Sequence, residues 1–221
     1  LEKKPKLLYT STCETYAGAL EAFNQLPLPT PEDVPRVISD IHNPRWSYAA
    51  SKILGEMLFI HFGNSQNIPT VIVDPHNFYG PREGYDHVLP ELIERIQKQV
   101  DPFPIYGTEN TRAFCYIDDA VEAMTLAMNS NVTDQFPVQT FHIGDPQEHS
   151  IQEMAELLFE IAGWRPSSIE SRPAPKGSTK RRSADPSKIE HLFGWKRKIS
   201  LQEGLRRMYA WYQQHPKLSS S

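Results

Sequence analysis

Short apolar segments alternate with helical segments along this chain of 221 residues. Apolar runs predict buried strands at residues 6–10 (KLLYT), 69–73 (PTVIV) and 139–143 (QTFHI). Helical periodicity predicts helices at residues 46–62, 88–100 and 118–128. Gly63 follows the first of these directly, as is typical of a helix C-terminus. Strand, helix, strand in this order indicates an α/β fold with a mostly parallel sheet.

Proline and capping residues divide the rest of the chain. Five prolines between residues 27 and 44 exclude long regular structure in that segment. Shorter strands are predicted at residues 105–107 and 113–117. Three late helix starts are predicted: Ser150 with Glu153, Ser200 with Glu203, and Asp185 followed by Pro186. These helices continue the α/β pattern toward the C-terminus.

The composition argues against nucleic acid or a membrane as the main partner. The net charge is −4, and no basic block extends beyond Lys180-Arg181-Arg182. No apolar stretch approaches the roughly 20 residues needed to span a bilayer. The two cysteines, Cys13 and Cys115, cannot form a disulfide framework and lack metal-ligand spacing. We therefore expect no metal site and a reducing, cytoplasmic location.

Tyr48 and Lys52 lie one helical turn apart in the predicted helix 46–62. Side chains at i and i+4 project from the same face, so the phenol and the ammonium can reach one ligand. A nearby cation favours the phenolate form, which makes Tyr48 a candidate general base. Thr12 follows the first predicted strand, where an open α/β sheet presents ligand-binding groups. A chance pair on an ordinary helix is the alternative for Tyr48 and Lys52 taken alone.

Four sequence motifs in a fixed order argue against a chance pair, and a C-terminal pattern follows them. The motifs are STCETY at 11–16, YAASK at 48–52, PHNFYGPR at 75–82 and TRAFCYIDD at 111–119, followed by Arg182, DPSK at 185–188 and GW at 194–195. In this order and spacing the chain resembles the extended short-chain dehydrogenase/reductases. More narrowly, it is similar to the NAD-dependent nucleotide-sugar epimerases, dehydratases and decarboxylases. The resemblance covers nearly the whole chain.

The resemblance implies roles for the Tyr-Lys pair and its surroundings. Thr12, Tyr48 and Lys52 match the family's catalytic Ser/Thr, Tyr and Lys. Tyr48 would remove the sugar hydroxyl proton while hydride leaves for the nicotinamide, and Lys52 would bind the nicotinamide ribose. Pro75 falls on the cofactor side of the site. NAD as cofactor, a nucleotide sugar as substrate and a homodimeric full-length protein are implied with them.

The resemblance also implies a set of substrate-binding residues. They are Asn77, Val88, Tyr106, Arg112 and Arg182. Two guanidinium groups suit a diphosphate, because their planar donors pair with phosphate oxygens. Each position also has a structural alternative: surface salt bridges for the arginines, packing on a strand for Tyr106, and a helix entry for Val88.

Cys13 and Glu14 bear on the reaction class. In the family's 4,6-dehydratases an Asp-Glu pair follows the catalytic hydroxyl, and in its UDP-glucuronate decarboxylases the pair is Ser-Glu. A thiol, with an ordinary pKa near 8.5, protonates a departing hydroxyl less readily than a carboxylic acid. Dehydration is therefore the alternative to decarboxylation or 4-epimerisation after oxidation at carbon 4. Glu14 could instead support the loop.

The chain also departs from the family pattern in two places. The glycine-rich turn that would hold the dinucleotide pyrophosphate is missing, so we expect a truncated chain. A non-catalytic fragment or assembly subunit unable to bind NAD alone is the alternative. Asp74 stands where many relatives carry Arg.

The predicted fold is a partial Rossmann-like, doubly wound parallel sheet with a smaller C-terminal substrate lobe. Residues 1–82 would form the C-terminal part of the NAD domain. Residues 83–221 would be mainly the substrate lobe, with about 112–144 returning to the NAD domain. With the helix before it missing, the helix with the Tyr-Lys pair would expose Ile53, Met57 and Ile60.

Overall fold

The structure is a computed structural model that describes residues 5–131, 137–175 and 178–217. Sixteen elements follow one another along these segments. The strands are β1 (Leu7–Thr10), β2 (Thr70–Pro75), β3 (Phe78–Tyr79), β4 (Phe103–Tyr106), β5 (Thr111–Arg112), β6 (Cys115–Tyr116), β7 (Val138–Ile143), β8 (His149–Ser150) and β9 (Ile169–Arg172). The helices are α1 (Glu14–Phe23), α2 (Trp46–Gln66), α3 (Val88–Gln97), α4 (Ile117–Asn129), α5 (Ile151–Ala162), α6 (Ser187–Phe193) and α7 (Leu201–Gln214). None of the helices described is long and apolar enough to cross a membrane.

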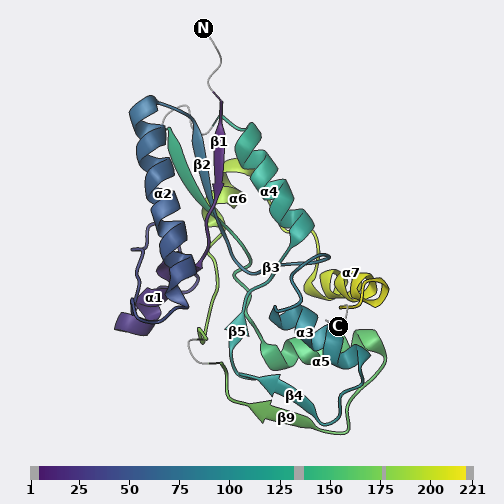
Figure 1. Cartoon of the computed structure of the whole chain (residues 1–221). Coiled ribbons are helices and arrows are strands. Elements are labelled where there is room, and N and C mark those ends of the chain that lie inside the picture. Colours follow the sequence, from purple (N-terminus) through teal and green to yellow (C-terminus); the bar gives the residue numbers. More distant parts are fainter. Residues whose placement is uncertain (1–4, 132–136, 176–177, 218–221) are drawn as a thin grey trace.

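Three parallel strands in the order β1-β2-β7 form the main sheet. Helix α2 covers one face, and α4 and α6 cover the other (Figure 1). The central strand β2 is apolar and β-branched, so it is buried on both faces. Ala120, Ala123 and Ala127 share one face of α4, and their small side chains let the helix pack closely on Val71 and Val73. The predicted Rossmann-like α/β arrangement is confirmed.

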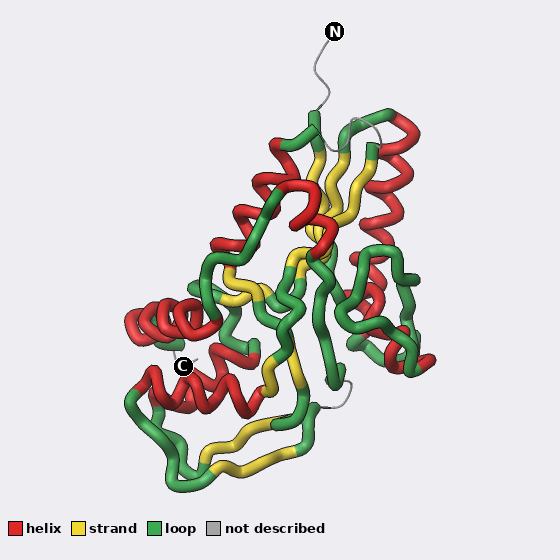
Figure 2. The backbone as a smooth tube through the Cα atoms, turned by 180° about the vertical axis from the view of Figure 1, so that it is seen from behind, coloured by secondary structure: helices red, strands yellow, loops and turns green. Residues whose placement is uncertain are grey.

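A second hydrophobic core lies among α3, α5 and α7, toward the other end of the molecule. The paired strands β4 and β9 run parallel along its edge, far from the three-stranded sheet (Figure 2). Its largest buried members are Leu89, Leu92, Ile93, Phe103, Ile105, Phe159 and Tyr212. The capping box predicted for Ser150 and Glu153 is present in full at the start of α5. Ser150 is also the last residue of β8, which pairs with β5, the strand that contains Arg112. The start of α5 is thereby held beside β5.

Several element boundaries differ from the predicted ones. Helix α2 continues past Gly63 to Gln66 and ends at Asn67, whose φ of 49° is left-handed. Gly63 serves close packing instead, because a Cβ there would lie 2.7 Å from the Thr70 hydroxyl. Helix α3 ends at Gln97, three residues before the predicted end. The capping box predicted for Ser200 and Glu203 is half formed. The Ser200 hydroxyl accepts the backbone N–H of Glu203, and this is the half that is present.

Asp119 ties helix α4 to the segment that leads into α7. Its side chain is 2% exposed, and its carboxylate accepts the backbone N–H groups of Lys198 and Ile199 at 3.0–3.2 Å. Its carbonyl accepts the Trp195 indole N–H at 3.0 Å. The neighbouring Asp118 is exposed instead. One buried carboxylate thus holds the link between the two hydrophobic cores.

Replacing Asp119 with Ala should therefore lower the free energy of unfolding by about 3 kcal/mol, because two backbone N–H groups and the Trp195 segment lose the buried charged acceptor that holds them. The matched Asp118→Ala variant should change it by less than about 0.5 kcal/mol. Urea unfolding followed by circular dichroism measures both. Equal effects of the two substitutions would contradict the role given to Asp119.

Candidate active site

Helix α2 brings the Tyr-Lys pair to the carboxyl end of β1. The Lys52 ammonium donates a 2.8 Å hydrogen bond to the carbonyl of Thr10, the last residue of β1. The same ammonium lies 5.9 Å from the centre of the Tyr48 ring. Trp46 opens the helix and is buried against Ala17 of α1, which fixes the helix start. Tyr48 itself is 52% exposed and open to a ligand.

The turn after β1 crosses onto the end of β2. The Ser11 N–H bonds the carbonyl of Val73 at 2.7 Å, and the Cys13 N–H bonds the carbonyl of Pro75 at 3.3 Å. Thr12 lies between them and is 8% exposed. Its hydroxyl oxygen accepts the backbone N–H of Glu14 at 3.3 Å. Thr12 is thus held at the same edge of the sheet as the carbonyl that Lys52 binds.

Glu14 lies between two arginines at the start of α1. One carboxylate oxygen is 2.8 Å from Arg45, which directly precedes α2, and the other contacts Arg182. Burial opposes ionisation, but the two guanidinium groups outweigh it and hold the pKa of Glu14 below its usual value. Cys13 beside it is 3% exposed, and burial raises the pKa of its thiol. At neutral pH the site therefore holds a carboxylate next to a neutral thiol.

Arg112 and Arg182 come together because residues 111–113 run beside residues 180–182. Backbone N–H groups of Thr111 and Ala113 donate to the carbonyls of Lys180 and Arg182 at 2.9 and 3.0 Å. Burial, together with the charge of Arg182, lowers the pKa of Arg112 to about 10. Burial would also weaken the charge of Arg182, but Cys13 and Glu14 raise its pKa above the usual value. The two cations are therefore close, and Arg182 is paired with Glu14.

Three of the predicted substrate-binding residues line one cavity of about 450 Å³: Val88, Tyr106 and Arg112. The cavity's other lining residues include Asp86, Arg95, Asn110 and Ser178. The Tyr106 hydroxyl accepts a 2.9 Å bond from Arg172. Asn77 lies outside this lining: its amide donates to the carbonyl of Ala113 at 2.8 Å, one residue after Arg112. Pro75 contributes its carbonyl to the Thr12 turn.

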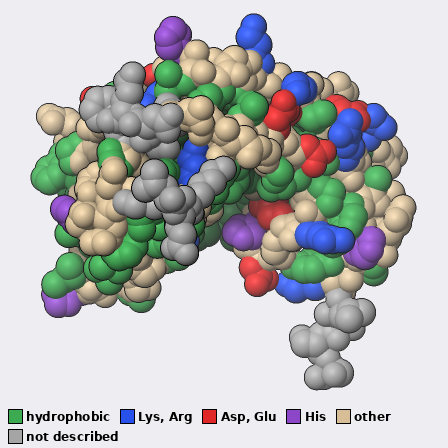
Figure 3. All heavy atoms as spheres, turned by 90° about the horizontal axis from the view of Figure 1, so that it is seen from above, with side chains coloured by type: hydrophobic (Ala, Val, Ile, Leu, Met, Phe, Trp, Pro, Cys, Tyr) green, Lys and Arg blue, Asp and Glu red, His purple; other side chains and the backbone are tan. Residues whose placement is uncertain are grey.

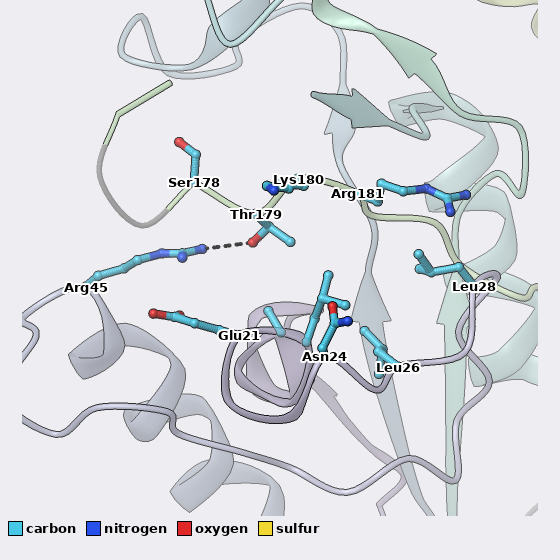
Figure 4. A pocket seen from close by; sticks show the side chains of 11 residues that line it. Glu21, Asn24, Leu26, Leu28, Arg45, Ser178, Thr179, Lys180 and Arg181 are labelled. Atoms are coloured by element: carbon cyan, nitrogen blue, oxygen red, sulfur yellow. Dashed lines mark hydrogen bonds between the residues drawn. The ribbon is translucent and has the colours of Figure 1, made fainter. Parts of the chain in front are cut away.

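A larger cavity, of about 640 Å³, adjoins the site from the side of α1 (Figure 4). Leu20, Leu26 and Leu28 form apolar wall, and Arg45 reaches the Thr179 hydroxyl at 3.3 Å. No residue predicted for the site lines this cavity. Arg45 was not predicted from the sequence. Its only sequence signal is a lone cation three residues before Tyr48.

Comparisons with known proteins agree on one group. A model of the family described as GDP-mannose 4,6 dehydratase matches residues 1–208. The chain is 30% identical over 223 aligned positions to the UDP-N-acetyl-alpha-D-glucosaminuronate decarboxylase of Bacillus cytotoxicus, covering 97% of this chain and 65% of that protein.

Solved structures of two epimerases are similar as well. The UDP-glucose 4-epimerase of Thermotoga maritima, solved with UDP-glucose, has a TM-score of 0.79 and 27% identity over 95% of this chain and 64% of its own. The UDP-glucose 4-epimerase of Thermus thermophilus, solved with NAD, has a TM-score of 0.75 and 26% identity. This match covers 94% of this chain and 64% of the epimerase chain. The chain thus spans somewhat less than two thirds of the length of these proteins.

The Glu14 ion pairs should make folding stability depend on pH. The folded-state pKa of Glu14 lies below its unfolded value, so its stabilisation is present above about pH 4.5 and is lost as the pH falls through the folded pKa. Thermal unfolding between about pH 6 and pH 3 should show a smaller acid-induced loss in Glu14→Gln than in the unchanged chain. Glu109→Gln, at an exposed position, is the control and should follow the unchanged chain. Identical acid profiles for Glu14→Gln and the unchanged chain would contradict the pairing.

Proposed function

The chain belongs to the GDP-mannose 4,6-dehydratase family of extended short-chain dehydrogenase/reductases, and we propose that it acts in NAD-dependent modification of a nucleotide sugar. The reaction begins with oxidation at sugar carbon 4 and continues with decarboxylation or epimerisation. The observation that carries the proposal is the 2.8 Å bond from Lys52 to the Thr10 carbonyl. It holds the Lys52 ammonium at the strand end that Thr12 follows, and the exposed Tyr48 ring lies 5.9 Å from that ammonium, which supports the proposal.

Each residue of this group has a defined task in the proposed reaction. The deprotonated phenol oxygen of Tyr48 takes the proton of the sugar's 4-hydroxyl, and the Thr12 hydroxyl orients that group. Lys52 stabilises the phenolate by its positive charge. NAD, when bound, accepts the hydride from carbon 4.

The nicotinamide end of NAD fits the residues present. Tyr48 is open to solvent, and Lys52, which the resemblance assigns to the nicotinamide ribose, stands beside it. Pro75 is the third residue we assign to this side. The 221 residues contain no glycine-rich turn of the kind that binds a pyrophosphate. We therefore assign only the nicotinamide end to this chain.

The 450 Å³ cavity supports a nucleotide as the far part of the substrate. Tyr106 is 39% exposed and lines the cavity, with the guanidinium groups of Arg95 and Arg172 over its ring, and Val88 gives an apolar wall. Arg112 and Arg182 lie between this cavity and Glu14, so their positive charges suit the diphosphate. The Asn77 amide bonds the carbonyl of Ala113, the residue that follows Arg112. We place the base near Tyr106 and the sugar near Thr12.

The acid-base character of Cys13 and Glu14 favours decarboxylation or epimerisation over dehydration. Dehydration needs an acid for the departing hydroxyl, and the raised pKa of the buried Cys13 thiol makes it a poor proton donor. It also needs a base at carbon 5, and the lowered pKa of Glu14 makes it a weak one. A β-keto acid loses CO₂ without such an acid. The 30% identity to a nucleotide-hexuronate decarboxylase supports the same choice.

Incubation with NAD and a panel of nucleotide hexoses and hexuronates tests the reaction, because loss of CO₂, loss of water and unchanged mass are distinct by mass spectrometry. We expect conversion of a hexuronate with loss of CO₂ or inversion at carbon 4. Tyr48→Phe should reduce the rate by about 10²-fold or more, because the base is removed. Tyr209→Phe, on α7, is the matched control and should retain the rate.

Loss of water as the main outcome would favour the dehydratase alternative. No conversion of any sugar, together with no binding of NAD, would favour the alternative of a non-catalytic assembly subunit. A Tyr48→Phe variant as active as the unchanged protein would contradict the catalytic role itself.

We further propose that α2 forms a homodimer interface. Ile53, Met57 and Ile60 were expected to be exposed. Met57 is exposed, whereas Ile53 and Ile60 are half-buried. The exposed apolar row also includes Leu54, Leu58 and Phe62, at 54–61% exposure. Seen from above, hydrophobic side chains gather on the side of the molecule where α2 lies (Figure 3). Such a patch is typical of a protein interface.

Sedimentation of the chain at about 50 µM, within the concentration range of ordinary dimers, should show a dimer. Leu58→Glu should give a monomer, because a charge would be buried in the interface. Leu192→Glu, at an exposed leucine of α6, is the control and should remain dimeric. A monomeric unchanged chain would contradict this assignment.

Two broader assignments complete the proposal. We assign residues 1–82 and about 112–144 to the cofactor domain and the remainder mainly to the substrate lobe. We also place the protein in a reducing cytoplasm. Support for this location comes from Cys13 and Cys115, which are both free and buried.

A further inference from the structure

A cluster of buried polar rings lies behind the strand ends that hold Thr12. Asp74 of β2 stands directly opposite His142 of β7, and both are 0% exposed. His76 follows Asp74 by two residues and is equally buried. Tyr16 of α1 stacks on His142 with ring centres 5.3 Å apart, and its hydroxyl bonds the His76 ring. Strands β2 and β7 and helix α1 thus enclose one polar cluster.

Arg36 joins two buried carboxylates in this cluster. It comes from the proline-rich segment and donates to Asp74 at 2.7 Å and to Glu56 at 2.8 Å. Glu56, on α2, is 4% exposed, and its other oxygen accepts the Ser11 hydroxyl. Ser11 directly precedes Thr12. Arg36 therefore supplies a positive charge to both buried carboxylates.

Both ring nitrogens of His142 face hydrogen-bond acceptors. Nδ1 is 2.9 Å from the carbonyl oxygen of Thr30, which can only accept. Nε2 is 3.1 Å from the Asp74 carboxylate. A neutral imidazole has one N–H, so it would leave two acceptors facing each other in one of these contacts. Either His142 carries both protons, or Asp74 carries one.

Two observations place the second proton on His142. The Asp74 oxygen that faces His142 also accepts the Arg36 bond, which favours the carboxylate. In addition, the backbone N–H of His142 bonds Glu32 at 3.0 Å, so another carboxylate stands close by. The remaining ring, His76, is neutral: burial and the charges of His142, Arg182 and Arg36 hold its pKa well below the usual value.

The charge balance of the cluster requires that proton. Asp74 and Glu56 carry two negative charges, and Arg36 supplies one positive charge. A neutral His142 would leave one buried negative charge uncompensated, which costs several kcal/mol. An imidazolium at His142 makes the sum of these buried groups zero, while Glu32 is only half-buried and its charge acts on Lys188. The proton therefore completes the same neutralisation that Arg36 begins.

We propose that His142 is a buried imidazolium, and that Arg36, Asp74, His142 and Glu56 form a neutral cluster that positions Ser11 and the turn carrying Thr12. The part that concerns Thr12 rests on the proposed function. The protonation of His142 does not, because it follows from the hydrogen-bond geometry together with the charges of Arg36, Asp74 and Glu56. These four are positioning residues, since none of them is assigned a contact with substrate.

Nitrogen-15 NMR of the full chain, labelled at its eight histidines, tests the protonation directly. At about pH 8, well above the ordinary histidine pKa of about 6.5, one ring should show two protonated nitrogens. That signal should disappear in His142→Gln. In Asp74→Asn, a nearly isosteric change, His142 should lose one proton, because the cluster would otherwise become positive. A ring of His142 with one bare nitrogen in the unchanged chain would overturn the proposal, whether or not the chain is catalytically active.

A rescue experiment tests the charge balance separately. Arg36→Gln should lower the melting temperature by on the order of 10 °C, because one buried negative charge loses its partner. Adding Glu56→Gln restores neutrality and should recover most of that loss. The exposed pair Arg172→Gln and Glu170→Gln is the control, and neither its single nor its double variant should move the melting temperature by more than about 2 °C. Failure of Glu56→Gln to rescue Arg36→Gln would show that Arg36 acts by shape, and would overturn the charge argument.

Discussion

The hydrogen bond from the Lys52 ammonium to the Thr10 carbonyl fixes how helix α2 meets the end of β1. Strand β1 lies at one edge of the described sheet, and the Lys52 ammonium supplies a partner for the carbonyl of its last residue. Tyr48 lies one helical turn before this lysine, with its ring centre 5.9 Å from the ammonium, while Ser11 and Cys13 bond to the backbone of β2 at the same end of β1. The candidate site thus depends on the parallel pairing of β1 and β2, which brings both carboxyl ends to one edge.

Carboxylates near this edge are each balanced by arginines from outside the sheet. Glu14 is held by Arg45 and Arg182, and Glu56 by Arg36. These arginines come from the proline-rich segment, the start of α2 and the segment before α6. Buried carboxylates would not remain ionised without such partners. The irregular segments therefore contribute to the electrostatics of the site as much as the regular elements contribute to its geometry.

The sequence predicted the main sheet well because the central strand β2 is a β-branched run that is almost wholly buried, and because β7 ends in the buried residues Phe141 and Ile143. Helix α1 was missed, since it is only ten residues long and its buried face consists largely of small residues such as Ala17 and Gly18. Short segments of this kind give weak periodicity. Gly63 misled the prediction of the end of α2, because a glycine required for close packing looks the same in a sequence as one that ends a helix.

The candidate site, like the fold, was predicted only in part from the sequence. The Tyr-Lys spacing and the four motifs identified residues whose roles depend on local order along the chain. Local order could not identify the arginine partners of Glu14 and Asp74. Arg45 lies 31 residues from Glu14 in the sequence, and Arg36 lies 38 residues from Asp74. Pairing over such separations is decided by the fold and by the requirement that buried charge be neutralised. A charge change such as Asp74 therefore signals, in a sequence, that a compensating cation must exist, although not which residue supplies it.

Thr12 lies between these two neutralised carboxylates, and this bears on the Tyr48 phenol. Ser11 on one side is bonded to Glu56, and Glu14 follows on the other. An unpaired carboxylate at either position would oppose formation of a phenolate nearby. Because arginines pair with both, neither carboxylate stands unpaired beside Thr12. Glu14 has two guanidinium partners and Arg112 lies close to Arg182, so this side of the strand end carries a surplus of positive charge, which suits the anionic part of the proposed substrate.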